Sequence, residues 1–391
     1  MANMKRDFLP NGRKVIWVGS QGLQIALAAE GGHIAALRAE GINEKSNPYW
    51  QPPWPSLEPS SVTSAIVNQG YGGPPEGKLL ASILGHSLAL DLYGAPSIEE
   101  AAAGHVTHGQ VAVQPWAWRQ PEENSLIGEC LDILGELKFS RHLNVIGCSA
   151  VIEERVENLR RCDRPIGWQQ HVSFGPPFCE DGFWASANCD RGTTHPQSFG
   201  TGASLVPNTE TQWPLAPQKD RERDYREPLT GDAQSNDFSG FRIRPSDEFG
   251  NFVAGNKRLR FALFYLWPRC FFPWLGIWDE RHARSEKPWC KEVSVRAFEF
   301  GASPYPDVRR NLLLRPRLFG VPTYLTLPAS QTFWVRYVMG VFAGISESGD
   351  LSLSGGKVSL LGPRGAIAQV DLPEICASST REEMNTANED L

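Results

Sequence analysis

The segment VSVRAFEFG at residues 293–301 has the side-chain pattern that decides the fold class. Successive side chains of a β-strand point to opposite faces, so the odd-numbered residues from Val293 to Glu299 would share one face. The serine, arginine and phenylalanines between them would share the other face. This period of two predicts a strand over 293–301.

Similar β-branched or alternating runs recur along the chain, and glycine (37 residues) and proline (30 residues) are spread throughout it. This spread predicts many short strands joined by turns. Helical periodicity is scarce, and the best candidate is SIEEAAAGH at 97–105, where Ser97 and Glu100 have capping-box spacing. We therefore predict an all-β protein with few short helices. The other runs are KVIWVGS (14–20), LQIALAA (23–29), HLNVIGCSAVIEERVEN (142–158), RFALFYLW (260–267), TFWVRYVMGVF (332–342) and KVSLLG (357–362).

A single large β-sandwich domain over residues 12–375 accounts for the length of the chain and for the lack of a clear linker. We find no repeat of fixed period, which argues against a propeller or a solenoid. The stretch 207–237 is polar and rich in turn residues, so we expect a long surface excursion there. Residues 376–391, CASSTREEMNTANEDL, are expected to form a polar C-terminal tail.

The composition argues against several classes of partner. The chain has 391 residues, of which 41% are hydrophobic and 21% charged, so it can bury a sizeable core. A formal net charge of −6 argues against a nucleic-acid or anionic-membrane partner, and no apolar stretch approaches the ~20 residues that span a bilayer. The N-terminal segment lacks the apolar region of a secretory signal, so we expect a cytoplasmic protein. The eight cysteines contain no C-x-x-C pair, so reduced thiols packed as small hydrophobic groups are expected.

Three histidines are concentrated in the turn-rich segment 82–116, namely His86, His105 and His108. His105 and His108 have the H-x-x-H spacing that a metal ion could use on a helix or loop. A third ligand is not evident in the sequence, so we predict no metal site. For His105 the simpler interpretation, a polar residue near the surface, is preferred.

Two other residues have side chains suited to moving protons. His171, in RPIGWQQHVSFGPPF (164–178), is either a hydrogen-bonded structural histidine or a catalytic one. Glu299 shares a strand face with apolar residues, and desolvation there would raise its pKa toward that of a usable base. The alternative for Glu299 is an ion pair with an arginine. Its neighbour Arg296 would be a poor partner, because it points to the opposite face of the strand.

Thirteen tryptophans are many for this length, and several stand beside or near proline, as Trp50 does in Pro48-Tyr49-Trp50. Such tryptophans belong to loops or strand ends, where the ring can line the mouth of a cleft. Aromatic walls with a few polar groups suit a sugar, whose C–H faces stack on rings. Filling the core remains the alternative for any single tryptophan.

The order of these motifs resembles the galactose mutarotase-like, or aldose 1-epimerase, superfamily. The resemblance rests on His108-Gly109 with the later Trp116, on Gln-His-x-x-Phe at 170–174, and on Glu299 in AFEFGASPYP. The early GGHIAAL (31–37) is also similar to that family. The resemblance implies a large antiparallel β-supersandwich that binds a sugar on a concave sheet and needs no cofactor.

The resemblance also implies roles for individual residues. His171 would protonate the ring oxygen and Glu299 would take the proton of the anomeric hydroxyl, from opposite sides of the anomeric centre. The ring would open and close again on its other face. The family usually has arginines before its first histidine, which corresponds to His108. This chain has LGHSLALD at that place instead, and His86 could take the place of one of the arginines. The implied sugar-binding residues are His108, His86, Gln170, Asp279, Trp278 and Trp50.

Several functions remain open from the sequence. The first is an aldose 1-epimerase-type isomerase acting on a free hexose or a hexose derivative. The second is a non-catalytic carbohydrate-binding protein of the same fold, which the missing arginines favour. A polysaccharide lyase or glycosidase would need a tyrosine or paired carboxylates, and we find no pair at recognisable spacing. The fourth possibility is a sandwich with a purely structural role. Whichever function applies, the chain could form a homodimer through an edge strand.

Overall fold

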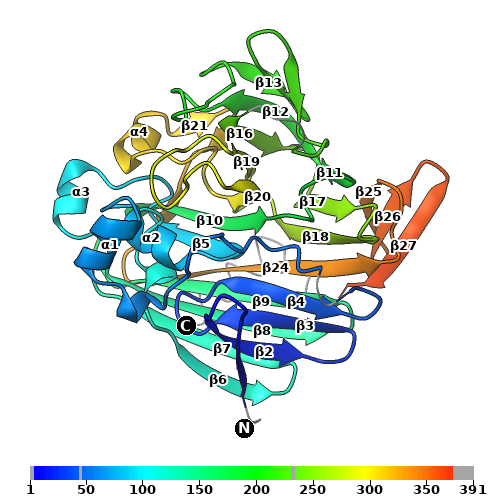
Figure 1. Ribbon diagram of the computed structural model, residues 1–391, viewed down its shortest axis with the longest axis horizontal. Helices are drawn as coiled ribbons and strands as arrows, with labels where there is room; N and C mark the ends of the chain where they lie inside the picture. Colours follow the sequence, from blue (N-terminus) through cyan, green and yellow to red (C-terminus); the bar gives the residue numbers. More distant parts are fainter. Residues whose placement is uncertain (1–3, 44–45, 230–233, 373–391) are drawn as a thin grey trace.

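Two large antiparallel sheets make up most of the computed structural model, which describes residues 4–43, 46–229 and 234–372 (Figure 1). The first sheet has twelve strands in the order β1-β2-β3-β4-β5-β10-β20-β19-β16-β12-β13, and β23 pairs with β10 beside this path. Their bounds are β1 (Lys5–Phe8), β2 (Lys14–Gly19), β3 (Leu23–Ala28), β4 (Ile34–Ala39), β5 (His86–Asp91), β10 (Arg164–Phe174), β20 (Ser294–Gly301), β19 (Trp274–Arg281), β16 (Ser235–Ile243), β12 (Cys189–Thr194), β13 (Glu210–Gln212) and β23 (Leu325–Leu327).

The second sheet has eight strands in the order β11-β17-β18-β24-β9-β8-β7-β6. Their bounds are β11 (Phe183–Ala187), β17 (Phe249–Asn256), β18 (Phe261–Pro268), β24 (Thr332–Ala343), β9 (Ser149–Asn158), β8 (Leu137–Ile146), β7 (Ser125–Asp132) and β6 (Ala117–Glu122). Smaller sheets pair β14 (Leu215–Pro217) with β15 (Glu222–Asp224), β21 (Arg317–Leu318) with β22 (Val321–Pro322), and β25 (Asp350–Ser354) with β26 (Lys357–Gly362) and β27 (Gly365–Asp371). The helices are short: η1 (Pro59–Ser61), α1 (Ser64–Gly70), α2 (Gly77–Ser82), α3 (Ile98–Ala102), η2 (Val111–Val113) and α4 (Arg309–Leu314).

The main core lies between the two large sheets, and the alternation in β20 shows why. Phe298 and Phe300 point inward and pack with Phe252 and Trp267 of the second sheet; the rings of Trp267 and Phe300 are stacked with centroids 4.2 Å apart. Burial of such large aromatic side chains is the main stabilising contribution to a sandwich of this kind.

A second apolar layer covers the outer face of the first sheet. The side chains on that face of β20, including Val295 and Ala297, contact α2 and a group of tryptophans. Because both faces of this sheet are covered, all eight residues of β20 are buried. A polar residue on this outer face therefore lies in an apolar environment, and the candidate site is found there.

The expectations from sequence are largely confirmed at this level. The fold is all-β, and α3 begins after Ser97 with the capping box to Glu100 in place. The run at 142–158 is two strands rather than one, because Gly147 turns the chain with φ of +58° between β8 and β9. The excursion at 207–237 is not wholly superficial: it carries β13, β14, β15 and the fully buried Tyr225. The expected tail at 376–391 lies outside the described residues.

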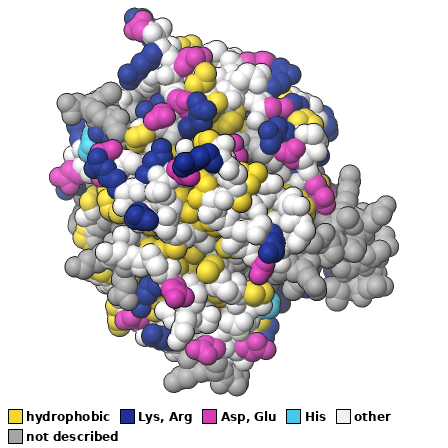
Figure 2. Space-filling view, turned by 90° about the vertical axis from the view of Figure 1, so that its right-hand side faces the viewer, with side chains coloured by type: hydrophobic (Ala, Val, Ile, Leu, Met, Phe, Trp, Pro, Cys, Tyr) yellow, Lys and Arg dark blue, Asp and Glu magenta, His cyan; other side chains and the backbone are white. Residues whose placement is uncertain are grey.

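Within the described part of the chain, no helix has the length and apolar character needed to cross a membrane. Basic and acidic side chains are interspersed over the face shown in Figure 2, so their charges largely offset one another there. The expectation of packed thiols is correct for three buried cysteines and wrong for four exposed ones: the former are Cys130, Cys179 and Cys189, the latter Cys148, Cys162, Cys270 and Cys290.

Candidate active site

The strand register brings the two predicted proton-handling residues together. β10 pairs with β20, and His171 lies directly opposite Glu299. Residues that are opposite in an antiparallel pair share a face of the sheet. His171 Nε2 is 3.1 Å from Glu299 Oε1, on the outer face of the first sheet. The two side chains are therefore in direct contact, although 128 positions separate them in the sequence.

This contact corrects one expectation about the geometry. The resemblance implied an acid and a base on opposite sides of a sugar, with the sugar between them. His171 and Glu299 contact each other directly, so a sugar would have to replace this contact to reach both groups. They lie side by side because adjacent strands hold them in register.

The pair lies at the bottom of a cavity of about 420 Å³. Most of the walls are apolar and aromatic, and Trp278 and Trp289 form part of them, as expected for a sugar site. Trp50 does not line the cavity: its ring stacks on that of Trp289 from behind, with centroids 6.2 Å apart. Other wall residues come from α2, from the loop at 195–199, from the loop before α4, from the segment after β5 and from β16.

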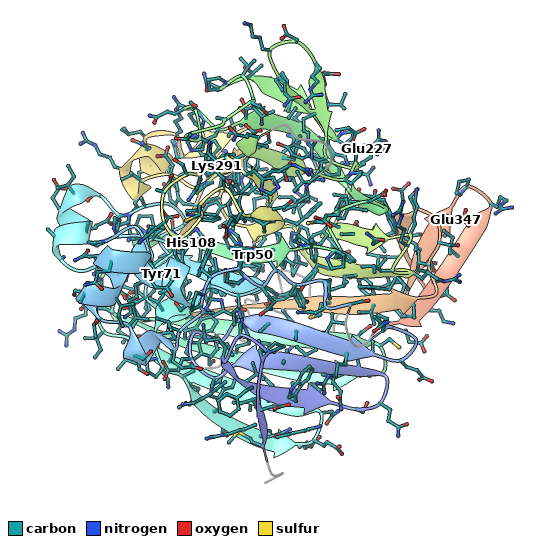
Figure 3. All side chains as sticks on the ribbon, viewed as in Figure 1. Trp50, Tyr71, His108, Glu227, Lys291 and Glu347 are labelled. Carbon is teal, nitrogen blue, oxygen red and sulfur yellow. The ribbon has the colours of Figure 1, made fainter. Side chains whose placement is uncertain are left out.

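His108 lies beside the pair, in the turn between α3 and η2 (Figure 3). Its backbone has φ of +65°, and a Cβ on the next residue, Gly109, would lie 1.9 Å from the carbonyl oxygen of Leu90. The sharp turn carries the His108 ring to within 5.3 Å of the His171 ring, measured between centroids. Its Nδ1 is buried and has no hydrogen-bond partner among the described residues.

Burial shifts the pKa values of this group so that each member is neutral near pH 7. Burial raises the pKa of Glu299 to about 8, and the hydrogen bond from the Tyr93 hydroxyl, 2.7 Å from Oε2, opposes that shift. Burial, followed by the effect of His108, lowers the pKa of His171 well below its usual value. Burial lowers the pKa of His108 to about 4. The His171–Glu299 pair therefore holds one proton, which resides on the carboxyl group at rest.

The hydrogen bonds around His171 agree with this protonation state. His171 Nδ1 is 3.0 Å from Ser173 Oγ, which can accept a hydrogen bond from the imidazole when Nδ1 carries the hydrogen. In that tautomer Nε2, 3.1 Å from Glu299 Oε1, is free of hydrogen and can take up a proton.

Gln170 and His86, which the resemblance placed in the site, lie on the other face of the sheet. Gln170 precedes His171 by one position in β10 and so points into the core, where its amide group donates to Glu154 Oε2 at 2.6 Å. His86 Nε2 is 3.0 Å from Gln170 Oε1, and its Nδ1 is 3.2 Å from the Tyr265 hydroxyl. Neither residue lines the cavity.

Asp279 is excluded from the cavity for the same reason. It is adjacent to Trp278 in β19, so the two side chains point to opposite faces. Asp279 accepts hydrogen bonds from Arg296 at 2.7 and 2.8 Å. Burial would raise the pKa of Asp279, but Arg296 and Arg223 lower it overall. Asp279 is the buried partner of two arginines.

Other residues of the site were missed from the sequence. Tyr93 follows β5 by two positions and has no motif that marks it. Arg284 lines the cavity, with its guanidinium carbon 4.5 Å from the centroid of the Trp289 ring and its Nη1 3.2 Å from Glu76 Oε1. The proximity of Arg284 to a Pro-Trp pair in WDERHARSEKPW is the only signal that could have indicated it. His105 does not line the cavity, and no three His, Cys, Asp or Glu side chains converge as metal ligands within the described residues.

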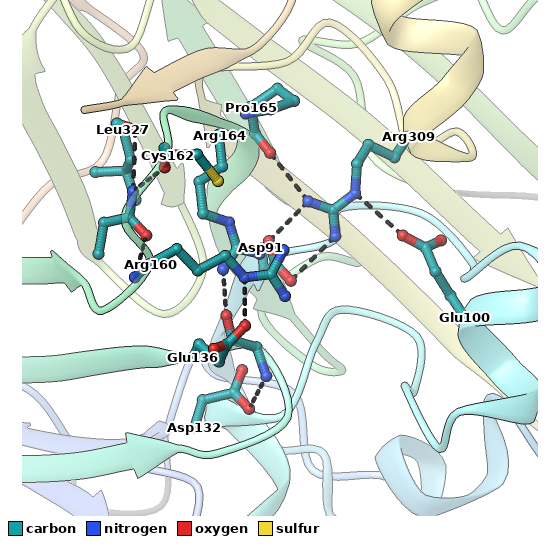
Figure 4. A network of polar contacts seen from close by, with 12 residues as sticks. Asp91, Glu100, Asp132, Glu136, Arg160, Cys162, Arg164, Pro165, Arg309 and Leu327 are labelled. Carbon is teal, nitrogen blue, oxygen red and sulfur yellow. Dashed lines mark hydrogen bonds and ion pairs between the residues drawn. The ribbon is translucent and has the colours of Figure 1, made fainter. Parts of the chain in front are cut away.

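A buried ionic network fixes the loops that carry the site residues (Figure 4). Arg309 of α4 donates to both carboxylate oxygens of Asp91, at 2.9 and 3.0 Å, and to Glu100 of α3 at 3.1 Å. Arg164 also pairs with Asp91. Burial would raise the pKa of Asp91, but the two arginines lower it overall. The network joins the end of β5, from which Tyr93 follows, to α3, to the start of β10 and to α4.

Comparison with known proteins identifies the fold. No protein-family model matches the chain, and a search of curated proteins finds no match. Among solved structures, a Klebsiella pneumoniae protein proposed to be an aldose 1-epimerase is similar, with a TM-score of 0.61, 14% identity, and coverage of 85% of this chain and 80% of that one. A galactose mutarotase related enzyme from Lactobacillus acidophilus has a TM-score of 0.55 and 12% identity over 85% and 99% of the two chains. A galactose mutarotase-like protein from Clostridium acetobutylicum has a TM-score of 0.51 and 12% identity over 87% and 98%. The chain therefore has the fold of the galactose mutarotase-like and aldose 1-epimerase-like proteins.

Proposed function

We propose that this chain is an aldose 1-epimerase-type isomerase, which interconverts the anomers of a reducing sugar bound in the 420 Å³ cavity. The observation that carries the proposal is the His171–Glu299 pair, which holds one proton at the bottom of an aromatic-walled cavity. A pair with one proton offers an acid and a base at the same time. The structural likeness to proteins named as mutarotases or epimerases supports the same proposal.

The side-by-side arrangement suits this reaction, because the ring oxygen and the anomeric hydroxyl are bonded to the same carbon. A sugar that replaces the contact between His171 and Glu299 would place these two oxygens against the two groups. Transfer of the shared proton to the imidazole gives the form in which His171 protonates the ring oxygen while Glu299 accepts the hydroxyl proton. The bond from C1 to the ring oxygen breaks, C1 becomes a carbonyl group, and rotation about C1–C2 followed by the reverse steps gives the other anomer.

His108 and the aromatic walls have supporting roles in this proposal. The Nδ1 of His108 is buried and without a partner among the described residues, so it is available to a sugar hydroxyl. Trp278 and Trp289 offer ring surface to the C–H groups of a sugar. No cofactor is required by the proposed proton transfers.

A non-catalytic carbohydrate-binding protein is the second candidate, and one observation favours it. The side chains of His171 and Glu299 are only 5% and 2% exposed and already contact each other. Arg284, the cation of the cavity wall, is engaged with Glu76. A sugar could therefore rest on the tryptophans without separating the pair.

Polarimetry of freshly dissolved α-D-glucose and α-D-galactose distinguishes the two candidates. We expect substoichiometric protein to accelerate the change in optical rotation, and His171→Asn to abolish this acceleration. His105→Asn, a histidine substitution outside the cavity, should keep the full rate. Sugar binding by calorimetry without acceleration would instead identify a binding protein, and full activity of His171→Asn would show that the assignment of this pair is wrong.

A further inference from the structure

A second cavity of about 300 Å³ lies where α1 and α2 meet (Figure 1). The two helices approach closely, since a Cβ on Gly77 of α2 would lie only 2.5 Å from Cγ1 of Val67 in α1. The volume is at the lower end of the roughly 300–1,000 Å³ typical of small-molecule sites. Much of the wall is apolar, and this part consists of Val62, Val67, Pro74, Pro75 and Val106.

Lys78 of α2 is the charged residue of this wall among those that the structure describes. It is half-buried, and its ammonium group has no hydrogen bond or ion pair within the described part of the chain. Burial lowers the pKa of Lys78, and the charge of Glu30 opposes that shift. Glu30 does not line the cavity, and its carboxylate accepts hydrogen bonds from the backbone N–H and the hydroxyl of Ser60, both at 2.7 Å. The cavity thus combines an apolar surface with a positive charge that lacks a direct counter-charge.

This charge and this surface together select one class of ligand. A bound anion would compensate the ammonium group, and its hydrocarbon part would cover the apolar wall. Ser64 and Asn68 add a hydroxyl and an amide group, each of which can donate a hydrogen bond to a carboxylate. An inorganic anion would leave the apolar wall in water, and a neutral apolar ligand would leave Lys78 without a counter-charge.

The second cavity is separated from the main one by a single layer of residues. Pro75 lines both cavities, and its carbonyl oxygen accepts a hydrogen bond from the backbone N–H of Thr107 at 3.3 Å. Val106 lines the second cavity, whereas Thr107 lines the main one; Lys78 and Leu79 divide in the same way. A ligand that contacts Lys78 therefore occupies a different space from a sugar at the His171–Glu299 pair.

We propose that the second cavity is a binding site for a small monocarboxylate with an apolar body, whose carboxylate pairs with Lys78 and whose hydrocarbon part packs on the valines of the wall. This inference goes beyond the proposed epimerase function, because it assigns a ligand class to a site that a sugar in the main cavity does not occupy.

Calorimetric titration with hexanoate, acetate and 1-hexanol tests the proposal. Hexanoate should bind more tightly than acetate, which lacks the apolar body, and more tightly than 1-hexanol, which lacks the charge. Lys78→Met keeps an unbranched side chain without the charge and should weaken hexanoate binding roughly fivefold. Arg284→Met removes a cation of the main cavity instead and should leave hexanoate binding unchanged.

A second pair of variants tests the location without removing a charge. Asn68 and Gln69 are both exposed on α1, but only Asn68 lines the second cavity. Asn68→Trp should fill the cavity and weaken hexanoate binding roughly tenfold, whereas Gln69→Trp should have no effect. Thermal unfolding checks that all four variants fold.

Several results would overturn the proposal. These are no binding of hexanoate, equal binding of 1-hexanol, and unchanged hexanoate binding in both Lys78→Met and Asn68→Trp. A loss of binding in Arg284→Met alone would place the ligand in the main cavity and would also overturn it. None of these measurements uses mutarotation, so failure of the epimerase function would be seen separately, by polarimetry.

Discussion

On the inner face of β10, Gln170 takes part in a closed hydrogen-bond network, whereas on the outer face His171 belongs to a group with unpaired atoms. Gln170 Nε2 donates to Glu154, its Oε1 accepts from the Tyr337 hydroxyl at 3.0 Å, and none of the three residues lines the main cavity. Beside His171, by contrast, His108 Nδ1 and Ser87 Oγ are buried without partners among the described residues. Adjacent residues of one strand thus lie in two polar environments of different kinds.

The difference separates polar groups that hold the sheets together from groups that are available to a ligand. A buried polar group that is fully paired contributes to stability, whereas an unpaired one lowers it and persists where function requires it. The Glu154 network links strands of both sheets through the core and has no contact with the cavity. The pair on the outer face lies at the bottom of a cavity and holds one proton. The following predictions test this division, beginning with the largest effect.

Removing the charge of Glu154 should lower stability more than any other single change considered. Arg141 is buried, and its Nη2 is 2.6 Å from Glu154 Oε1. Glu154→Leu would leave that guanidinium without its counter-charge in the core, with an expected loss of about 3–5 kcal/mol in the free energy of unfolding. Urea unfolding measures the loss. As a control, Glu210→Leu, which removes an exposed pair with Arg191, should change stability by less than about 1 kcal/mol; equal losses in both variants would contradict the division.

The corresponding change on the outer face, Glu299→Gln, should affect rate and leave stability nearly unchanged. Burial raises the pKa of Glu299 to about 8, so the carboxyl is neutral at pH 7 and an amide of the same shape can replace it. Loss of the group that exchanges protons should lower kcat about a hundredfold or more. Polarimetry and urea unfolding of the same preparation provide the two measurements. A strong loss of stability with an unchanged rate would assign Glu299 to the scaffold.

Much of this division could be predicted from the sequence, and the part that could not has a physical reason. The period of two in VSVRAFEFG correctly placed Glu299 on a face with Val295 and Ala297. The same rule, applied to Gln170 beside His171, would have assigned that glutamine to the opposite face. The resemblance to a family overrode the rule there.

Other features depend on contacts that the sequence pattern does not contain. The direct contact of His171 with Glu299 depends on the register between β10 and β20, which are about 130 positions apart. Tyr93 reaches Glu299 only because the chain after β5 folds back over the outer face, and Arg284 lines the cavity from a loop. Local patterns give the face of a strand but not the strand beside it.

The pH dependence of the rate tests whether the outer pair works as a unit with one proton. With the pKa of Glu299 at about 8 and that of His171 well below its usual value, the pair loses its single proton as the pH rises through about 8. Activity should therefore be constant around neutrality and should fall above that pH, because no acid remains. The Tyr93 hydrogen bond lowers the pKa of Glu299, so Tyr93→Phe should move the fall to higher pH. A profile that rises through pH 8 would contradict the shared proton.

Two serines on the outer face allow the smallest and most specific test of the comparison. Ser87 and Ser173 are both fully buried, in β5 and β10 respectively. Ser173 Oγ is 3.0 Å from His171 Nδ1, whereas Ser87 Oγ has no partner among the described residues. Ser173→Ala removes a hydrogen bond and should lower the free energy of unfolding by about 1 kcal/mol, while Ser87→Ala removes only an unpaired hydroxyl and should be neutral or slightly stabilising. If urea unfolding instead shows that Ser87→Ala is the more destabilising change, unpaired polar atoms on this face contribute to stability. The distinction between the two faces would then not hold for these two serines.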